Sequence, residues 1–189
     1  MNHHHQTLEA EVAVIGGSFG GVAAALALTC QGRRVVLTEQ YSWIGGQVTS
    51  QALCVADDYT DPCSEGVGMN RSYCEFRERI RDYYKTRYTL SDFGKSQLNF
   101  VPGNAACSSL TADPDVAHGV LLDMLDEAVS KGLLHIITNV VPLDAEVEGD
   151  RICNVTVADL SDEKTTTQIK ADFFLDGTDC GDTFPLVGA

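Results

Sequence analysis

The chain has 189 residues, of which 44% are hydrophobic and 21% charged, the balance of an ordinary globular domain rather than of a disordered or fibrous protein. This length suits a single domain that buries a core of its own. Thirteen Lys and Arg against 27 Asp and Glu give a formal net charge of −14. Such a charge repels nucleic acid and anionic membrane surfaces, and we expect neither as a partner.

The cysteines and the N-terminus give expectations about location and metal binding. The seven cysteines are widely spaced and contain no C-x-x-C pair, so we predict reduced thiols in a cytoplasmic protein and no metal site. They are Cys30, Cys54, Cys63, Cys74, Cys107, Cys153 and Cys180. Residues 1–10 are polar and acidic and lack the order of a secretory signal. We expect a flexible tail over residues 1–10 and a folded domain over residues 11–189.

The folded part is predicted to begin with a strand, a helix and a second strand. Residues 11–15 and 34–38 are short runs rich in β-branched residues, typical of buried strands. Residues 21–31 are rich in Ala and Leu, which favours a helix, and Gly32 ends it. Two parallel strands joined by a helix form a right-handed crossover unit, so the pattern predicts an α/β fold with a Rossmann-like, doubly wound parallel sheet.

Helices and a third strand are predicted next. Residues 40–70 show no periodicity and indicate an ordered loop or an insertion. An amphipathic helix follows, because apolar and aromatic residues recur at helical spacing, and a second helix is predicted from Asp113 and Pro114 to Lys131. Residues 133–138 can form a third parallel strand. The fold therefore includes an inserted helical region.

Beyond residue 140 the hydrophobic period changes to two. Leu143, Ala145 and Val147 alternate with acidic residues, and Gly149-Asp150 suits a two-residue hairpin turn. Residues 152–159 and 168–175 continue the alternation. We therefore predict a β-meander of consecutive antiparallel strands.

The junction between the first strand and the first helix is rich in glycine. It reads Gly16, Gly17, Ser18, Phe19, Gly20 and Gly21. In the dinucleotide-binding fingerprint, the first glycine permits a tight turn, the second lets the backbone approach the diphosphate and the third lets helix and strand pack closely. Ser18 stands at the second position, where a small side chain is tolerable and a hydroxyl can donate to a phosphate. A glycine-rich helix start in another α/β fold is the alternative reading.

The end of the second strand carries an acidic residue. Glu39 lies at the spacing at which an acid accepts hydrogen bonds from the adenosine ribose and disfavours the 2′-phosphate of NADP. Gln40 follows it, and a second glycine pair, Gly45 and Gly46, comes a few residues later, before Gln47. The fingerprint alone does not separate NAD from FAD, and the glycine pair alone reads as an ordinary turn.

Taken together, these residues resemble the N-terminal portion of the FAD-dependent oxidoreductases that have a glutathione-reductase-type FAD domain. The resemblance continues through residues 47–51, 70–77, 101–104 and 171–182. It implies that FAD is the cofactor and that the second glycine pair lines the flavin-side phosphate and ribityl chain, with Gln40 and Gln47 beside the cofactor. It also implies that Gly177 and Thr178 lie near FAD, although alanine is commoner at the first of these positions. Val141 is a candidate for an adenine contact through its backbone; a sheet-packing valine is the equally open alternative.

The resemblance implies an enzyme that transfers a hydride between an organic small-molecule substrate and bound FAD. No catalytic residue is assigned, because His118 and His135 fall on a predicted helix and beside a strand, where structural histidines are common. Arg71, Tyr73 and Arg77 either reach an anionic substrate or belong to a solvated helix face. Family members continue past the last residue of this chain, so we expect a missing substrate domain. A truncated or non-catalytic dinucleotide-binding module and an NAD-dependent enzyme remain the alternatives.

Overall fold

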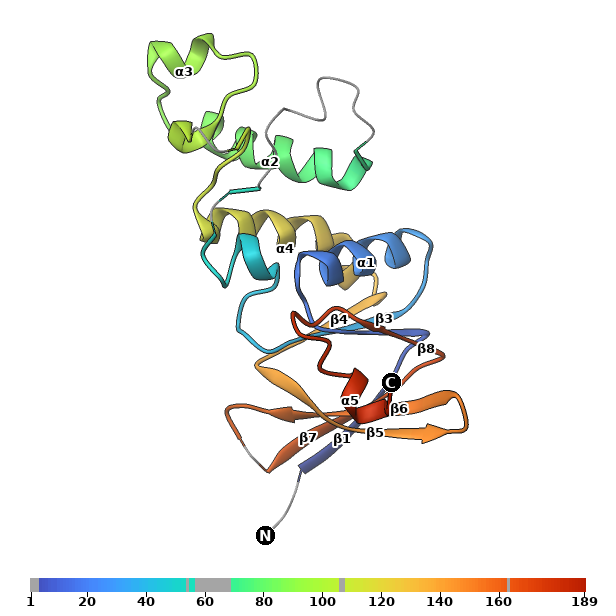
Figure 1. Cartoon of the computed structure of the whole chain (residues 1–189). Helices are drawn as coiled ribbons and strands as arrows, with labels where there is room; N and C mark the ends of the chain where they lie inside the picture. The colour runs from blue at the N-terminus through green and yellow to red at the C-terminus, as the bar shows by residue number, and fades with distance from the viewer. Residues whose placement is uncertain (1–3, 54, 57–68, 106–107, 163) are drawn as a thin grey trace. The chain divides into compact units, whose positions relative to one another are not determined.

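The computed structural model describes residues 4–53, 55–56, 69–105, 108–162 and 164–189. The chain divides into two compact units: Met1–Gly46 with Leu125–Ala189, and Gln47–Met124. The first unit contains the two sheets, and the second is helical in its described part (Figure 1). The second unit is thus an insertion in the chain of the first, as the sequence predicts.

A parallel sheet forms the centre of the first unit. Its strand order is β4-β3-β2-β8, and every neighbouring pair is parallel. The strands are β2 (Val12–Ile15), β3 (Val35–Glu39), β4 (Leu134–Thr138) and β8 (Phe173–Asp176). All residues of β2 and β3 are buried, as expected for a parallel sheet that is covered on both faces. The three parallel strands predicted from the sequence are confirmed.

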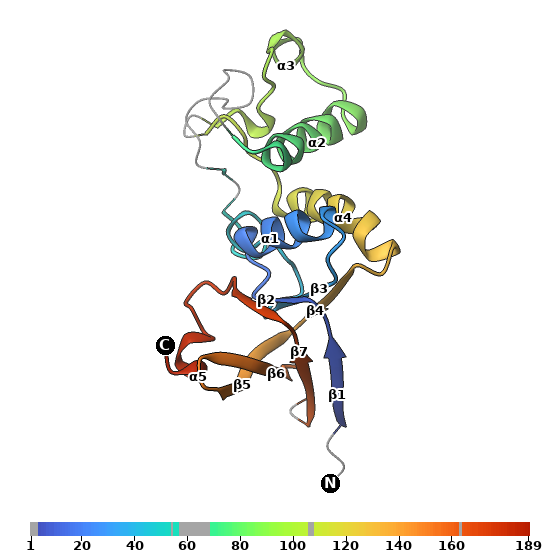
Figure 2. The same ribbon diagram turned by 90° about the vertical axis from the view of Figure 1, so that its right-hand side faces the viewer.

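Helix α1 (Phe19–Cys30) covers one face of this sheet and buries Val22 and Ala25 (Figure 2). Gln31 is its C-cap, and the next residue, Gly32, has φ +78°. Only glycine enters this left-handed region without a steric cost, which explains the stop. The predicted strand-helix-strand unit is therefore confirmed.

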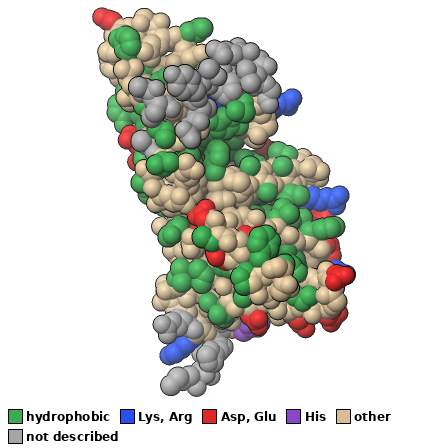
Figure 3. All heavy atoms as spheres, in the orientation of Figure 1, with side chains coloured by type: hydrophobic (Ala, Val, Ile, Leu, Met, Phe, Trp, Pro, Cys, Tyr) green, Lys and Arg blue, Asp and Glu red, His purple; other side chains and the backbone are tan. Residues whose placement is uncertain are grey.

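The second sheet has the order β1-β7-β6-β5. Strands β5 (Val140–Glu148), β6 (Arg151–Asp159) and β7 (Thr165–Lys170) are antiparallel, and Glu148 pairs with Arg151 across the predicted hairpin turn. Acidic side chains of β5 point to solvent, and red acidic groups are scattered over the visible face of the molecule (Figure 3). The predicted β-meander is confirmed for these three strands.

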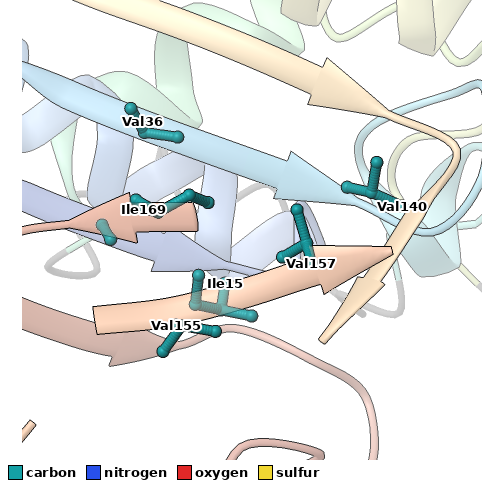
Figure 4. Packing of buried hydrophobic residues seen from close by; sticks show 7 residues of the cluster. Ile15, Val36, Val140, Val155, Val157 and Ile169 are labelled. Atoms are coloured by element: carbon teal, nitrogen blue, oxygen red, sulfur yellow. The ribbon is translucent and has the colours of Figure 1, made fainter. Parts of the chain in front are cut away.

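The two sheets pack face to face and enclose the main core (Figure 4). Its fully buried members come from both sheets: Ala13, Ile15, Val36, Val140, Val155, Val157 and Ile169. Val155 and Val157 lie two residues apart on one strand, which places both on the same face. Helix, parallel sheet and meander therefore make the layered α/β fold that the sequence predicts.

The N-terminal residues differ from the prediction of a flexible tail. His4–Glu9 form strand β1, which pairs in parallel with the whole of β7. Leu8 packs against the core cluster, whereas its neighbours on the strand are exposed. The tail prediction is wrong for His4–Glu9, because backbone pairing to the free edge of β7 orders a strand that has little apolar surface.

The segment predicted as one strand over residues 168–175 is two strands. Its first half belongs to β7 in the meander, and its second half is β8 in the parallel sheet. Between them, the amides of Asp172 and Phe173 both donate to the carbonyl oxygen of Glu11, at 3.1 and 3.2 Å. The paired segments β1-β2 and β7-β8 thus change sheets together, and the prediction of a continuous antiparallel strand is wrong.

The second unit contains helices α2 (Arg71–Arg87) and α3 (Asp92–Ser96) and the 3₁₀ turn η2 (Pro102–Asn104). The 3₁₀ turn η1 (Gly46–Val48) and helix α4 (Pro114–Ser130) cross the unit boundaries, and α5 (Phe184–Val187) belongs to the first unit. The two long predicted helices are confirmed. Two arginines of α2 are buried, however: Arg77 donates to Ser109 Oγ at 2.8 Å, and Arg81 donates to the carbonyl oxygen of Phe100 at 3.1 Å. The solvated-face interpretation is therefore wrong for Arg77, and Arg81 on the same helix is buried as well.

The cysteines also depart from the prediction. Cys30, Cys153 and Cys180 are free thiols, but Cys74 is disulfide-bonded. The reduced-thiol prediction is therefore wrong for Cys74, while Cys54, Cys63 and Cys107 lie outside the described residues. Among the helices that the structure describes, none combines the length and the apolar character needed to cross a membrane.

Candidate functional site

The carboxyl ends of three parallel strands meet at one edge of the sheet. Ile15 of β2 is in register with Thr38 of β3 on one side and with Asp176 of β8 on the other. In open parallel sheets, ligands bind beyond these ends. An open cleft lies there, with about 320 Å³ of empty space when the adjoining open solvent is included. Its lining comes entirely from the first unit: Gly16, Ser18, Thr38, Glu39, Gln40, Val140, Pro142, Gly177, Thr178, Asp179 and Asp182.

The glycine turn after β2 leaves no room for side chains at two positions. Gly16 has φ +100°, and a Cβ added to it would lie 2.3 Å from the amide nitrogen of Thr178. A Cβ added to Gly21 would lie 2.1 Å from the carbonyl oxygen of Gly16. These are the first and third glycines of the fingerprint, and they let α1 start directly against the strand.

Ser18 is the N-cap of α1. Its Oγ accepts a hydrogen bond from the amide of Gly21 at 3.3 Å, and its carbonyl oxygen accepts from Val22 at 2.9 Å. Because the hydroxyl oxygen is the acceptor in the cap, the hydroxyl hydrogen can still donate to an anion. The helix N-terminus itself favours negative charge. Ser18 therefore fits the second position of the fingerprint.

The second glycine pair packs on this turn. The amide of Gly45 donates to the carbonyl oxygen of Gly17 at 2.7 Å, and a Cβ added to Gly46 would lie 3.2 Å from Cα of Ser18. Both glycines have positive φ, of +107° and +52°. They pack against the turn and are not among the residues that line this cleft, and their place beside the flavin-side phosphate and ribityl chain stays a prediction.

Glu39 is a buried carboxylate at the cleft, 5% exposed. Burial raises its pKa above the ordinary value, hydrogen bonds from the amides of Tyr41, Gly17 and Gln40 act in the opposite direction, and the charge of Asp179 raises it further. The Tyr41 amide donates to Oε1 at 3.0 Å. These amides fix the carboxyl group at the end of β3.

Asp176 organises the loop on the other side of the cleft. It accepts hydrogen bonds from the amide and hydroxyl of Thr178, at 2.8 and 2.6 Å, and from the amide of Thr183 at 3.0 Å and its hydroxyl. Burial acts to raise the pKa of Asp176, but these hydrogen bonds outweigh it and leave the pKa below its ordinary value. These hydrogen bonds to Asp176 therefore fix the loop that carries Asp179 and Asp182.

The structure also explains why residue 177 is glycine in this chain, although alanine is commoner there in the family. The amide of Gly177 donates to the carbonyl oxygen of Ile15 at 2.7 Å, and a Cβ added to it would lie 2.4 Å from the carbonyl oxygen of Gly16. The two backbones are too close for alanine in this chain.

All the predicted site residues except Gln47 and Val141 fall into two groups. Gly16, Ser18, Glu39, Gln40, Gly177 and Thr178 line the cleft; Gly17, Phe19, Gly20, Gly21, Gly45 and Gly46 build or support the turn without lining it. Gln47 lies in the second unit and stays a prediction. Val141 does not line the cleft, although Val140 and Pro142 on either side of it do, so its backbone contact with adenine also stays a prediction.

Several lining residues were missed in the sequence: Thr38, Val140, Pro142, Asp179 and Asp182. Thr38 lies at the carboxyl end of a parallel strand, a position that commonly belongs to such a site. Asp179 and Asp182 lie in the segment 171–182, of which the resemblance placed only Gly177 and Thr178 near FAD. Neither His118, whose pKa is lowered by burial, nor the exposed His135 lines the cleft.

The donors and acceptors at the cleft fit a dinucleotide. A glycine turn and a helix N-terminus suit a diphosphate, and a buried carboxylate suits ribose hydroxyls. The sequence profile described as FAD dependent oxidoreductase matches residues 11–189. The chain belongs to this family. FAD is the cofactor of the family, as the sequence predicts.

Solved structures with a similar fold support the fold of this member of the family. A flavoprotein/dehydrogenase from Cytophaga hutchinsonii has a TM-score of 0.55 and 15% identity, covering 96% of this chain and 42% of that one. Mycobacterium smegmatis Sdh1 in complex with UQ1 has a TM-score of 0.57 and 11% identity, covering 90% of this chain and 34% of that one. Thermovibrio ammonificans THI4 has a TM-score of 0.52 and 17% identity, covering 96% of this chain and 64% of that one. The chain thus spans about a third to two thirds of the length of these proteins. No curated protein matches the sequence significantly.

Proposed function

We propose that the first unit binds FAD and that the bound flavin exchanges a hydride with an organic small-molecule substrate. The observation that carries this proposal is the convergence of the Gly16–Gly21 turn, the second glycine pair and Glu39 at one sheet edge in a member of this family. Because the chain spans only part of the length of its structural neighbours, the substrate and the activity of the whole protein belong to the proposal.

The residues of the first unit would act on the cofactor as follows. The N-terminus of α1, capped by Ser18, would hold the diphosphate, since its amides and dipole attract negative charge. Glu39 would accept hydrogen bonds from the adenosine ribose, because amides hold its carboxyl group in place. The backbone of Val141 would contact adenine. FAD supplies the two-electron chemistry, and the protein supplies binding and orientation.

The first experiment is an absorbance spectrum of the purified protein, before and after heat release of any ligand, with chromatography to identify the released compound. A bound or added flavin identified as FAD supports the proposal, and bleaching by candidate substrates without oxygen then identifies the substrate. Tight binding of NAD without flavin would favour the NAD-dependent alternative. Failure to bind FAD even when it is added would leave the non-catalytic module.

A charge placed at the helix cap tests the diphosphate site directly. Asp is a good N-cap residue, so Ser18→Asp should preserve α1 while placing a negative charge beside the diphosphate. We expect FAD affinity to fall at least about tenfold, or 1.4 kcal/mol, in a fluorescence titration. Ser91→Asp is the matched control, because Ser91 caps α3 in the second unit in the same way. Equal affinities of the two variants would rule out this diphosphate site.

A further inference from the structure

Asp179 lies in the cleft opposite the acid of the fingerprint. Strand β2 lies between β3 and β8, with Gly16 directly after it. Neighbouring strands are about 4.8 Å apart, so the ends of β3 and β8 are separated by roughly 10 Å. Glu39 is the last residue of β3, and Asp179 lies in the loop after β8; both line the cleft. The charge of Asp179 also acts on Glu39 and raises its pKa, so the two carboxyl groups interact.

We propose that Asp179 is a second carboxylate of the cofactor site and that, with Glu39, it makes the adenosine end of the cleft select an unphosphorylated ribose. This inference rests on the proposed binding of FAD by the first unit. It assigns to Asp179 a role in specificity that is not part of the glycine fingerprint.

The chemistry of the lining supports this selection. Ionised carboxylates only accept hydrogen bonds, whereas ribose hydroxyls and the adenine amino group can donate them. A phosphate on the ribose would instead bring negative charge between two carboxylates. Asp182 adds a third acid to the lining, and none of the described residues that line the cleft is Lys or Arg. No cationic side chain among these lining residues would therefore offset the repulsion at the ribose.

The interaction of the two acids also predicts a pH dependence. Burial is the largest cause that raises the pKa of Glu39; the amides of Tyr41, Gly17 and Gln40 lower it, and the charge of Asp179 adds a smaller increase. Asp179 raises the pKa of Glu39, so Glu39 becomes protonated, and loses its full capacity to accept from ribose, at a higher pH than it would without this neighbour. Asp179→Asn should therefore extend binding to lower pH.

The test compares the calorimetric affinities of ADP-ribose and 2′-phospho-ADP-ribose for the full chain. The affinity for 2′-phospho-ADP-ribose divided by that for ADP-ribose should be about tenfold higher in Asp179→Asn than in the wild type, because one repulsive charge is removed. The acid limb of ADP-ribose binding, that is, the pH range over which the affinity falls on acidification, should also lie at lower pH in this variant. Asp126→Asn is the matched control, since it removes one exposed acid of the first unit outside the cleft.

The outcomes separate this inference from the proposed function. If the wild type binds FAD and ADP-ribose but Asp179→Asn leaves the ligand ratio and the acid limb as they are in the wild type, the role of Asp179 is wrong and FAD binding stands. If the wild type binds neither FAD nor ADP-ribose, both proposals are wrong. Effects of equal size in Asp126→Asn would also overturn the inference, because they would reflect net charge alone.

Discussion

At the scale of single residues, the close approach of Gly16 and Gly177 sets the shape of the cleft. A Cβ at Gly177 would meet the backbone oxygen of Gly16 at 2.4 Å and Cα of Gly21 at 3.1 Å. Neither atom can move without moving the strand or the helix that carries it. We therefore expect Gly177→Ala to lower the free energy of unfolding by about 1–3 kcal/mol, the usual cost of overpacking, and to weaken FAD binding.

The control for this change is Gly119→Ala. Gly119 lies inside α4, where an added Cβ would have no atom within 4 Å. Alanine in a helix interior is favoured over glycine, so this variant should be more stable by roughly 0.5–1 kcal/mol. Urea titrations followed by circular dichroism measure both changes. If Gly177→Ala is as stable as the wild type, the close approach in the structure is incorrect.

At the scale of elements, β1 provides a test of the paired segments that join the two sheets. Leu8 packs against the core, whereas Thr7 on the same strand is exposed. Leu8→Asp should lower the free energy of unfolding by about 1–3 kcal/mol, because it exchanges apolar contact for a charge, and Thr7→Asp should have little effect. Hydrogen exchange of the β7 amides should accelerate only in the first variant. A flexible tail, in contrast, would tolerate both substitutions equally.

The same elements show which parts of the fold the sequence predicts. The parallel strands and α1 follow from hydrophobic runs, and the turn follows from glycines whose backbone angles and contacts exclude other residues. Strand β1 could not be predicted in this way, because most of its side chains are exposed and its pairing uses the backbone. The sheet change at Asp172 was hidden because the period of two continues through it. Asp179 was not singled out, because neither the glycine pattern nor the hydrophobic period marks it, although Gly177 and Thr178 beside it were predicted near FAD.

The buried arginines of α2 show a second limit. Arg77 and Arg81 fall between apolar positions of an amphipathic helix, where charge normally indicates a solvated face. Their burial depends on hydrogen-bond acceptors from distant segments, such as Ser109 and the carbonyl oxygen of Phe100. Burial beside Arg81 also lowers the pKa of Arg77 to about 10. No local pattern carries this information.

At the scale of the whole molecule, the division of the chain into two units predicts which unit a bound nucleotide stabilises. Every residue that lines the cleft belongs to the first unit, whereas the second unit has its own buried residues, among them Phe76 and Ile80. ADP is expected to bind the native cleft and not the unfolded chain, and so to stabilise the first unit in proportion to its concentration and affinity.

Hydrogen exchange with and without ADP can locate this stabilisation. We expect slower exchange in the segments at the carboxyl ends of β2, β3 and β8, because opening them would release the ligand. Amides of α2 should exchange at the same rate in both conditions, since local opening of the second unit leaves the cleft residues in place. Ser18→Asp, which weakens the diphosphate site, should reduce the protection at the strand ends at the same ADP concentration. Equal protection of α2 would show instead that the two units open as one cooperative unit, and protection confined to α2 would place the nucleotide outside the cleft.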